Sequence, residues 1–129
     1  MNAKTRVKEA IEEIKKGNMV IMLDDEDREN EGDLVYSAAL STPELVNFMV
    51  THAKGLVCVS VSSETAKRLE LFPMVSNNTS SYETAFTVSV DDVNAATGIS
   101  AIERDNTIKI LANPIAKAVE LVRPGHIFP

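Results

Sequence analysis

Ten consecutive residues, 24–33, carry most of the side chains in this sequence that could bind a cation or exchange protons. They read Asp-Asp-Glu-Asp-Arg-Glu-Asn-Glu-Gly-Asp, which is seven acids against one base. The whole chain has 19 acidic and 13 basic residues, so the formal charge of −6 lies entirely in this stretch. Carboxylates this crowded need a counter-charge, and a hard divalent cation bound through oxygen is an ordinary source, although Mg²⁺ typically uses only one or two carboxylates. The composition therefore predicts a cation site.

The spacing of the acids is compatible with an extended segment. Alternate side chains of such a segment share one face. That face would hold four acids, Asp27, Glu29, Glu31 and Asp33. A calcium-binding EF-hand loop starting at Asp27 would need a bidentate Glu at its twelfth position, where this chain has Ala38. The flanks, residues 19–23 and 34–36, also read as strands, so the EF-hand is excluded.

Residues 23–33 closely resemble the acidic loop of the 3,4-dihydroxy-2-butanone 4-phosphate synthase family, which acts in riboflavin biosynthesis. The resemblance covers nearly the whole chain and continues, in the family's order, through Gly55–Cys58, Asn77–Ser80, Thr84–Val88, Thr97–Ala101 and Arg123–Pro129. It implies a metal-dependent lyase that converts D-ribulose 5-phosphate into L-3,4-dihydroxy-2-butanone 4-phosphate and formate. It also implies Mg²⁺ or Mn²⁺ as cofactor and a homodimer with active sites close to the subunit boundary. Because the family continues past the position of Pro129 into a segment with a Gly-His-Thr-Glu motif, we expect residues 1–129 to be a single, C-terminally incomplete domain.

The resemblance also implies roles for single residues. Glu29 matches the family's metal ligand, which acts together with a His of the later segment, and it lies at the substrate site. Arg28 matches a substrate contact, where a guanidinium beside a metal could stabilise an oxyanion. A purely structural counter-ion is the alternative for Arg28. His126 falls at the position of the family's essential His and is predicted to be catalytic.

Three further acids, Asp24, Glu31 and Asp33, are the acid-base candidates. Crowded carboxylates raise one another's pKa and can then exchange protons near neutral pH. Asp33 ranks first because it also matches a substrate-binding position of the family. The three acids that remain in the stretch are expected to be structural or exposed: Asp25, Glu26 and Asp27.

Two small polar residues complete the predicted site, each with a simpler alternative. Cys58 matches a thiol near the family's active site, but it lies in an apolar run and could be an ordinary core residue. The hydroxyl of Thr97 could bond a substrate oxygen or cap a turn. In the same region Glu103 stands where the family usually has Asp.

Bulk composition limits the classes of protein. A chain of 129 residues with 44% hydrophobic residues fits one domain. The acidic balance argues against sequence-independent nucleic-acid binding and favours a small charged metabolite, such as the sugar phosphate that the resemblance implies. A single cysteine suits a reducing cytoplasm, and the absence of a long apolar run predicts no membrane association.

The elements that position these residues follow from periodicity and capping signals. We expect helices at residues 5–16, 43–52 and 100–111, a short helix capped by Ser62 or Ser63, and a long loop at 71–83. Strands are expected at 19–23, 56–61 and 85–90, the first covered on both faces and the last ended by Asp91 and Asp92. These elements predict an α+β fold, a mixed twisted sheet covered by helices. The resemblance implies a three-layer sandwich.

Two other interpretations stay open. The chain could be the front of a bifunctional protein whose other half resembles GTP cyclohydrolase II. It could also be a non-catalytic metal-binding module.

Overall fold

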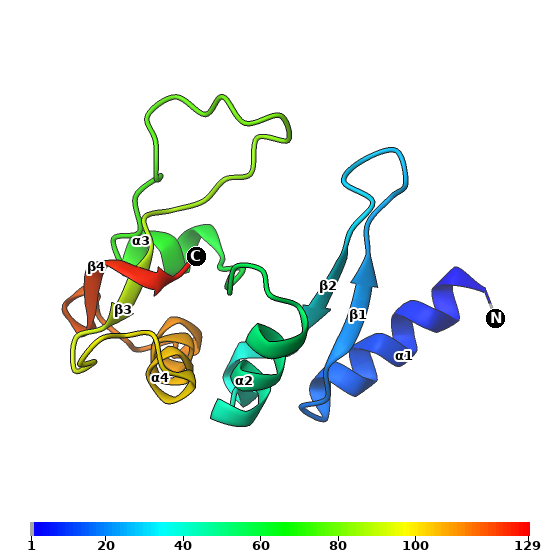
Figure 1. The fold of residues 1–129 in the computed structure, drawn as a ribbon, viewed down its shortest axis with the longest axis horizontal. Coiled ribbons are helices and arrows are strands. Elements are labelled where there is room, and N and C mark those ends of the chain that lie inside the picture. The colour runs from blue at the N-terminus through cyan, green and yellow to red at the C-terminus, as the bar shows by residue number, and fades with distance from the viewer. Residues whose placement is uncertain (1) are drawn as a thin grey trace.

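The computed structural model describes residues 2–129 and has the predicted α+β class (Figure 1). Its helices are α1 (Ala3–Lys15), α2 (Pro43–His52), α3 (Ser63–Arg68) and α4 (Ala101–Ala112). Its strands are β1 (Val20–Leu23), β2 (Gly32–Val35), β3 (Val90–Asp92) and β4 (Leu121–Ile127). Two short 3-10 helices, η1 (Ala38–Leu40) and η2 (Ala118–Glu120), precede α2 and β4.

The helices begin where side-chain caps allow them to begin. The side chains of Thr42, Ser62 and Ser100 accept hydrogen bonds from backbone N–H groups in the first turns of α2, α3 and α4. The helix predicted at 43–52 has these bounds in the structure, with Thr42 as its cap and Ser41 just before it. Ser41 is buried, and its hydroxyl lies 3.0 Å from that of Tyr36.

The strands form two separate antiparallel pairs instead of one continuous mixed sheet. β1 pairs with β2 from Val20 opposite Val35 to Leu23 opposite Gly32, and β3 pairs with β4. The only parallel contact among residues 2–129 is a single bridge between Cys58 and Phe128. The strand expected at 56–61 is therefore reduced to this bridge.

The strand expected at 85–90 begins later than predicted. Thr87 makes only an isolated bridge to Pro73, and regular pairing starts at Val90. The prediction that Asp91 and Asp92 end this strand is wrong, because both lie inside β3 and both are buried. Their polar groups find partners in β4 and α4, which compensates for burial.

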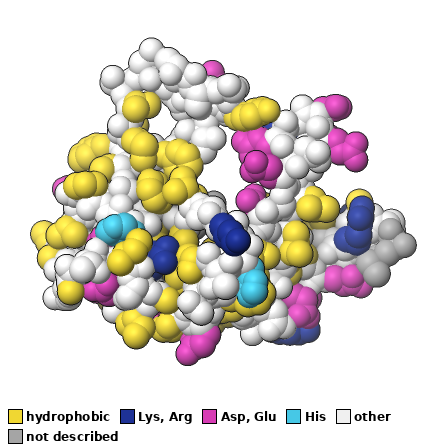
Figure 2. All heavy atoms as spheres, in the orientation of Figure 1, with side chains coloured by type: hydrophobic (Ala, Val, Ile, Leu, Met, Phe, Trp, Pro, Cys, Tyr) yellow, Lys and Arg dark blue, Asp and Glu magenta, His cyan; other side chains and the backbone are white. Residues whose placement is uncertain are grey.

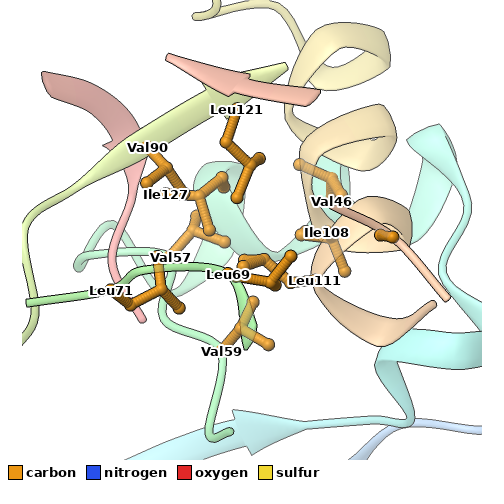
Figure 3. Packing of buried hydrophobic residues seen from close by; sticks show 11 residues of the cluster. Val46, Val57, Val59, Leu69, Leu71, Val90, Ile108, Leu111, Leu121 and Ile127 are labelled. Carbon is orange, nitrogen blue, oxygen red and sulfur yellow. The ribbon is translucent and has the colours of Figure 1, made fainter. Parts of the chain in front are cut away.

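The hydrophobic core lies between α2, α4 and the β3–β4 pair, together with the segment 57–71 (Figure 3). Leu69, Ile127 and Val46 are its largest fully buried apolar side chains. The β1–β2 hairpin and α1 lie to one side of this core (Figure 1). The core thus fixes β3, β4 and α4 and leaves the hairpin projecting.

The prediction that β1 is covered on both faces is wrong. Ile21 is 70% exposed and Leu23 is 77% exposed, because β1 and β2 form a two-stranded hairpin that projects from the core (Figure 1). Within residues 2–129 no helix combines the length and the apolar character that crossing a bilayer requires.

Candidate active site

Residues 24–31 of the acidic stretch connect β1 to β2 and fold into a compact turn, whereas Gly32 and Asp33 already belong to β2. The carboxylate of Asp24 organises this turn by accepting hydrogen bonds from the backbone N–H groups of Asp25 (2.8 Å) and Glu29 (2.9 Å). Asn30, with φ +53°, takes a left-handed conformation that Asn tolerates, where the chain returns toward β2. The prediction of an extended segment with four acids on one face is therefore wrong. Figure 2 shows acidic side chains gathered at this end of the hairpin.

The hydrogen bonds around Asp24 change its acidity in the direction opposite to our expectation. The backbone N–H of Glu29, followed by that of Asp25 and the guanidinium of Arg28, lowers the pKa of Asp24 below its ordinary value. Crowding by other acids is therefore not what sets its proton affinity. The expectation that crowding raises the pKa of Asp24 is therefore wrong.

A large cavity of about 920 Å³ lies between β2 and the segment 56–63. Glu29 and Asp33 reach it from the hairpin, and Cys58 reaches it from the opposite wall. Residues 84–87 and Pro129 close a further side. Three of the predicted site residues therefore share one cavity. Glu31 lines a smaller cavity of about 330 Å³ that Asp33 and Cys58 also line.

Cys58 faces the cavity and is exposed, so its interpretation as a core residue is wrong. The surrounding protein raises the pKa of its thiol by desolvation, and the nearby Asp33 carboxylate raises it further. The group is therefore a neutral thiol at physiological pH. Such a side chain can line a substrate pocket without acting as a nucleophile.

Arg28 is held by groups on both sides. Its guanidinium lies 2.9 Å from Asp24 and 3.4 Å from Glu29, and these carboxylates, Asp24 first, raise its pKa. Tyr82, from the long loop, donates its hydroxyl to the backbone oxygen of Arg28 at 3.0 Å, and its ring centre lies 5.5 Å from the guanidinium. Sequence reasoning missed Tyr82, although an aromatic residue in a long polar loop was a usable signal.

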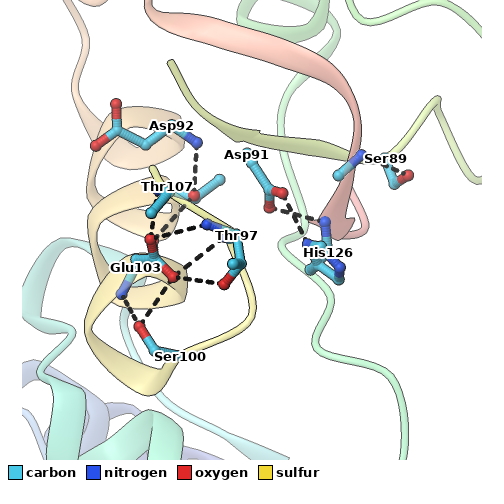
Figure 4. A network of polar contacts seen from close by, with 11 residues as sticks. Ser89, Asp91, Asp92, Thr97, Ser100, Glu103, Thr107 and His126 are labelled. Carbon is cyan, nitrogen blue, oxygen red and sulfur yellow. Dashed lines mark hydrogen bonds and ion pairs between the residues drawn. The ribbon is translucent and has the colours of Figure 1, made fainter. Parts of the chain in front are cut away.

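His126 lies near the end of β4 and is tied to Asp91 (Figure 4). Its Nδ1 is 2.7 Å from one Asp91 oxygen, and its backbone N–H donates to the other at 2.8 Å. Asp91 is only 6% exposed, whereas the His126 side chain is partly open to solvent. A buried carboxylate at Nδ1 fixes the orientation and tautomer of the ring. Sequence reasoning missed Asp91 because the acid pair was assigned to the end of the strand.

Four predicted site residues line neither cavity: Asp24, Arg28, Thr97 and His126. The hydroxyl of Thr97 lies 3.3 Å from a carboxylate oxygen of Glu103, in the turn before α4. Thr97 therefore takes part in closing a turn, which is the simpler of its two predicted roles.

A divalent cation bound in the large cavity would need oxygen donors from the residues that line it. Within residues 2–129 no three His, Cys, Asp or Glu side chains converge closely enough to form a complete metal site. Glu29 and Asp33 nevertheless offer hard oxygen donors to the same cavity. Since Mg²⁺ commonly binds through one or two carboxylates and several waters, these residues fit part of such a site.

Comparison with known proteins relates this chain to one family. Residues 8–129 match the family model for 3,4-dihydroxy-2-butanone 4-phosphate synthase. The chain is 67% identical over 124 residues to the protein of that name from Sulfurospirillum multivorans and 60% identical to that from Helicobacter pylori. It is 57% identical to the riboflavin biosynthesis protein RibBA of Bacillus mycoides. These matches cover 96% of this chain but only 31–36% of the relatives, so the chain spans about a third of their length.

Solved structures agree with the sequence matches. A 3,4-dihydroxy-2-butanone 4-phosphate synthase in complex with two magnesium ions superimposes with a TM-score of 0.92 at 42% identity, over 95% of this chain and 58% of that one. RibBX, a two-domain 3,4-dihydroxy-2-butanone 4-phosphate synthase from A. baumannii, superimposes with a TM-score of 0.91 at 47% identity, over 95% of this chain and 36% of that one. Both the sequence and the fold thus lead to the same family.

Proposed function

The chain belongs to the 3,4-dihydroxy-2-butanone 4-phosphate synthase family, and from this premise we propose that it acts in a metal-dependent lyase of riboflavin biosynthesis. The reaction converts D-ribulose 5-phosphate into L-3,4-dihydroxy-2-butanone 4-phosphate and formate. The observation that carries the proposal is that Glu29, Asp33 and Cys58 line one cavity of about 920 Å³. That volume lies in the range of small-molecule sites.

Glu29 is the proposed ligand of Mg²⁺ or Mn²⁺. Its backbone N–H donates to Asp24, its carboxylate lies 3.4 Å from the Arg28 guanidinium, and its side chain lines the cavity. The similar structure with two magnesium ions supports a divalent cation. When bound, such a cation polarises a substrate oxygen as a Lewis acid.

Arg28 and Asp33 are proposed to act on the substrate beside the metal. Arg28 supplies a fixed positive charge for a phosphate or an oxyanion, because Asp24 contacts its guanidinium and Tyr82 its backbone oxygen. Asp33 is proposed to move a proton and to contact the substrate, and Glu31 and Asp24 remain the alternatives. Cys58 forms the opposite wall, and Thr97 remains a proposed substrate contact.

His126 is proposed as a second proton-transfer group. Asp91 occupies the Nδ1 side of its ring, so Nε2 is left to exchange a proton with a substrate. The homodimer that the family resemblance implies also remains a proposal. Exposed apolar side chains support it, because burying apolar surface between subunits is stabilising. The most exposed of these are Leu23, Ile115, Val119, Ile21 and Phe72.

The proposal is tested by measuring formate release from D-ribulose 5-phosphate. Because the chain spans about a third of its relatives, we would assay it alone and as an extended chimera, defined as residues 1–129 continued into the remainder of the Sulfurospirillum multivorans relative. We expect the extended chimera to release formate and the 129-residue chain to release none. An inactive, folded chimera would contradict the proposed activity.

A two-domain arrangement is a second proposal about the whole protein. The RibBX relative is a two-domain protein, and this chain covers 36% of it. This chain likewise covers only part of RibBA, 31% of its length. The gene sequence that follows codon 129 would decide whether a second domain, such as one resembling GTP cyclohydrolase II, is present. A non-catalytic metal-binding module has no specific observation in its favour.

A further inference from the structure

The carboxylate of Glu103, in the first turn of α4, holds together the turn formed by residues 96–98 (Figure 4). It accepts hydrogen bonds from the backbone N–H groups of Ala96 (2.6 Å), Thr97 (3.3 Å) and Gly98 (3.1 Å). It also accepts from the hydroxyls of Thr97 and Ser100. These donors, the N–H of Ala96 foremost, lower the pKa of Glu103 to about 2. The turn therefore depends on one side chain that is charged at neutral pH.

The turn that Glu103 holds is packed directly against Asp91. Gly98 is buried, has φ +80°, and lies so close that a side chain added to it would overlap the Asp91 carboxylate. A side chain added to Gly125 would overlap the backbone of Val90 and Asp91 in the same way. Asp91 is thus enclosed by close backbone approaches that only glycine permits at these positions.

Both oxygens of Asp91 are already committed to His126, one to its backbone N–H and one to Nδ1. A further link runs behind the site: the backbone N–H of Asp92 donates to the Thr107 hydroxyl (2.8 Å), which donates to the Glu103 backbone oxygen (3.1 Å). The carboxylate of Glu103, the 96–98 turn and Asp91 therefore form one connected support behind the His126 ring.

We propose that Glu103 is a positioning residue for His126. It locks the 96–98 turn, the turn confines the Asp91 carboxylate, and Asp91 holds the His126 ring with its proton on Nδ1 and with Nε2 free. The inference rests on the proposed function in one respect only, that His126 exchanges a proton with the substrate. The positioning itself is a property of the fold and can be measured without turnover.

Replacing Glu103 by Gln tests the charge with little change of shape. Two oxygens of Glu103 accept from donors on both sides, whereas Gln offers one acceptor and one NH₂ group. Whichever way the amide is turned, an NH₂ group then faces an N–H or O–H donor. Glu103→Asp keeps both acceptors and is the conservative variant. Glu120→Gln is the matched control, because Glu120 also accepts from a backbone N–H, that of Lys117 at 2.6 Å, but the bond closes η2.

Nitrogen-15 NMR of the imidazole rings is the measurement. The chain has only two histidines, so His52 serves as an internal reference in every spectrum. At a pH where both rings are neutral, we expect His126 to show a single tautomer with the proton on Nδ1. In Glu103→Gln we expect a mixture of tautomers, and the His126 backbone N–H should exchange with solvent about tenfold faster, as for a weakened charge-assisted hydrogen bond. Glu103→Asp and Glu120→Gln should keep the wild-type tautomer.

An unchanged His126 tautomer in folded Glu103→Gln would overturn the inference. If that variant does not fold, Gly98→Ala replaces it, since the added methyl group presses on Asp91 and leaves Glu103 intact. An unchanged His126 in Gly98→Ala would overturn the inference equally. In the extended chimera, Glu103→Gln should lower kcat with little change in KM. A chimera that releases no formate while His126 responds as described would remove the proposed function and leave this inference standing.

Discussion

At the scale of single residues, the acids of the stretch 24–33 have different structural roles although they carry the same charge. Asp24 accepts backbone hydrogen bonds and builds the turn, whereas Glu29 and Asp33 face the cavity. Sequence reasoning found the cation-binding character of the stretch, because seven acids in ten residues need compensation. It could not distinguish the acids that form the turn from the acids that line the cavity, because that distinction depends on which carboxylate accepts hydrogen bonds from the backbone N–H groups of the folded turn. The role of Asp91 was not predicted for the same reason, because its partner His126 lies 35 residues away in the sequence.

Replacing Glu29 by Gln in the extended chimera should remove activity and leave the fold intact. The proposed metal loses its carboxylate, and a metal that supplies several kcal/mol of transition-state stabilisation makes the loss about a hundredfold or more in kcat. Glu26→Gln is the matched control, because Glu26 is an exposed acid of the same turn. Formate release at ordinary Mg²⁺ concentration, together with circular dichroism, measures both effects. Equal turnover by the two variants would remove Glu29 from the metal site.

Glu103 should make the stability of the chain depend on pH in acid. Its folded-state pKa of about 2 lies below its ordinary value of 4.5, so it stabilises the fold at pH above 4.5. That contribution is lost as the pH falls from 4.5 to about 2, when the carboxylate is protonated in both states. The difference in unfolding free energy between wild type and Glu103→Gln should therefore shrink over this interval. Urea titrations at several pH values measure it, and a difference that stays constant would be inconsistent with this assignment.

At the scale of elements, helices were predicted well and strands poorly. The ends of α2 and the start of α4 lie where local signals put them, since a hydroxyl cap and an early Pro or Glu act within four residues. A strand needs a partner that local sequence does not specify. Residues 57–59 pair with Phe128, about 70 positions away, and only through one bridge. The prediction for β1 failed for a similar reason. An apolar run indicates that a strand is buried, but it does not indicate which elements pack against the strand.

The core that holds these elements should respond strongly to truncation. Leu69 is fully buried among residues from α2, α4 and β4, so Leu69→Ala should cost about 2–5 kcal/mol of unfolding free energy. Ile102, which is 63% exposed, is the matched control, and Ile102→Ala should change stability by less than about 0.5 kcal/mol. Chemical denaturation of the two variants gives both values. A similar loss of unfolding free energy in the two variants would contradict the assignment of Leu69 to the core.

At the scale of the whole molecule, the α+β class and the family could be predicted, while the arrangement of the cavity could not. An acidic stretch of unusual composition and five further matching segments sufficed to name the family, and the family model confirms it. The cavity is made by β2, residues 56–63 and residues 84–87, which come together only through tertiary packing. The sequence therefore predicted Glu29, Asp33 and Cys58 as site residues, but it did not predict that they line the same cavity.

The extended chimera should be a homodimer. The exposed apolar side chains named above favour association, because burying such surface is stabilising. Light scattering over a range of protein concentrations should return twice the mass of one chain. A mass of one chain at every concentration would contradict the proposed assembly.

Formate release by the extended chimera is the most direct test of the proposed function. Wild-type chimera, incubated with D-ribulose 5-phosphate and Mg²⁺, should release one formate for each four-carbon product, and chelation of the metal should stop the reaction. We expect this chemistry to take place in the cavity that Glu29 and Asp33 line. Formate release that continues undiminished after the metal is removed, or a folded chimera that never releases formate, would contradict it.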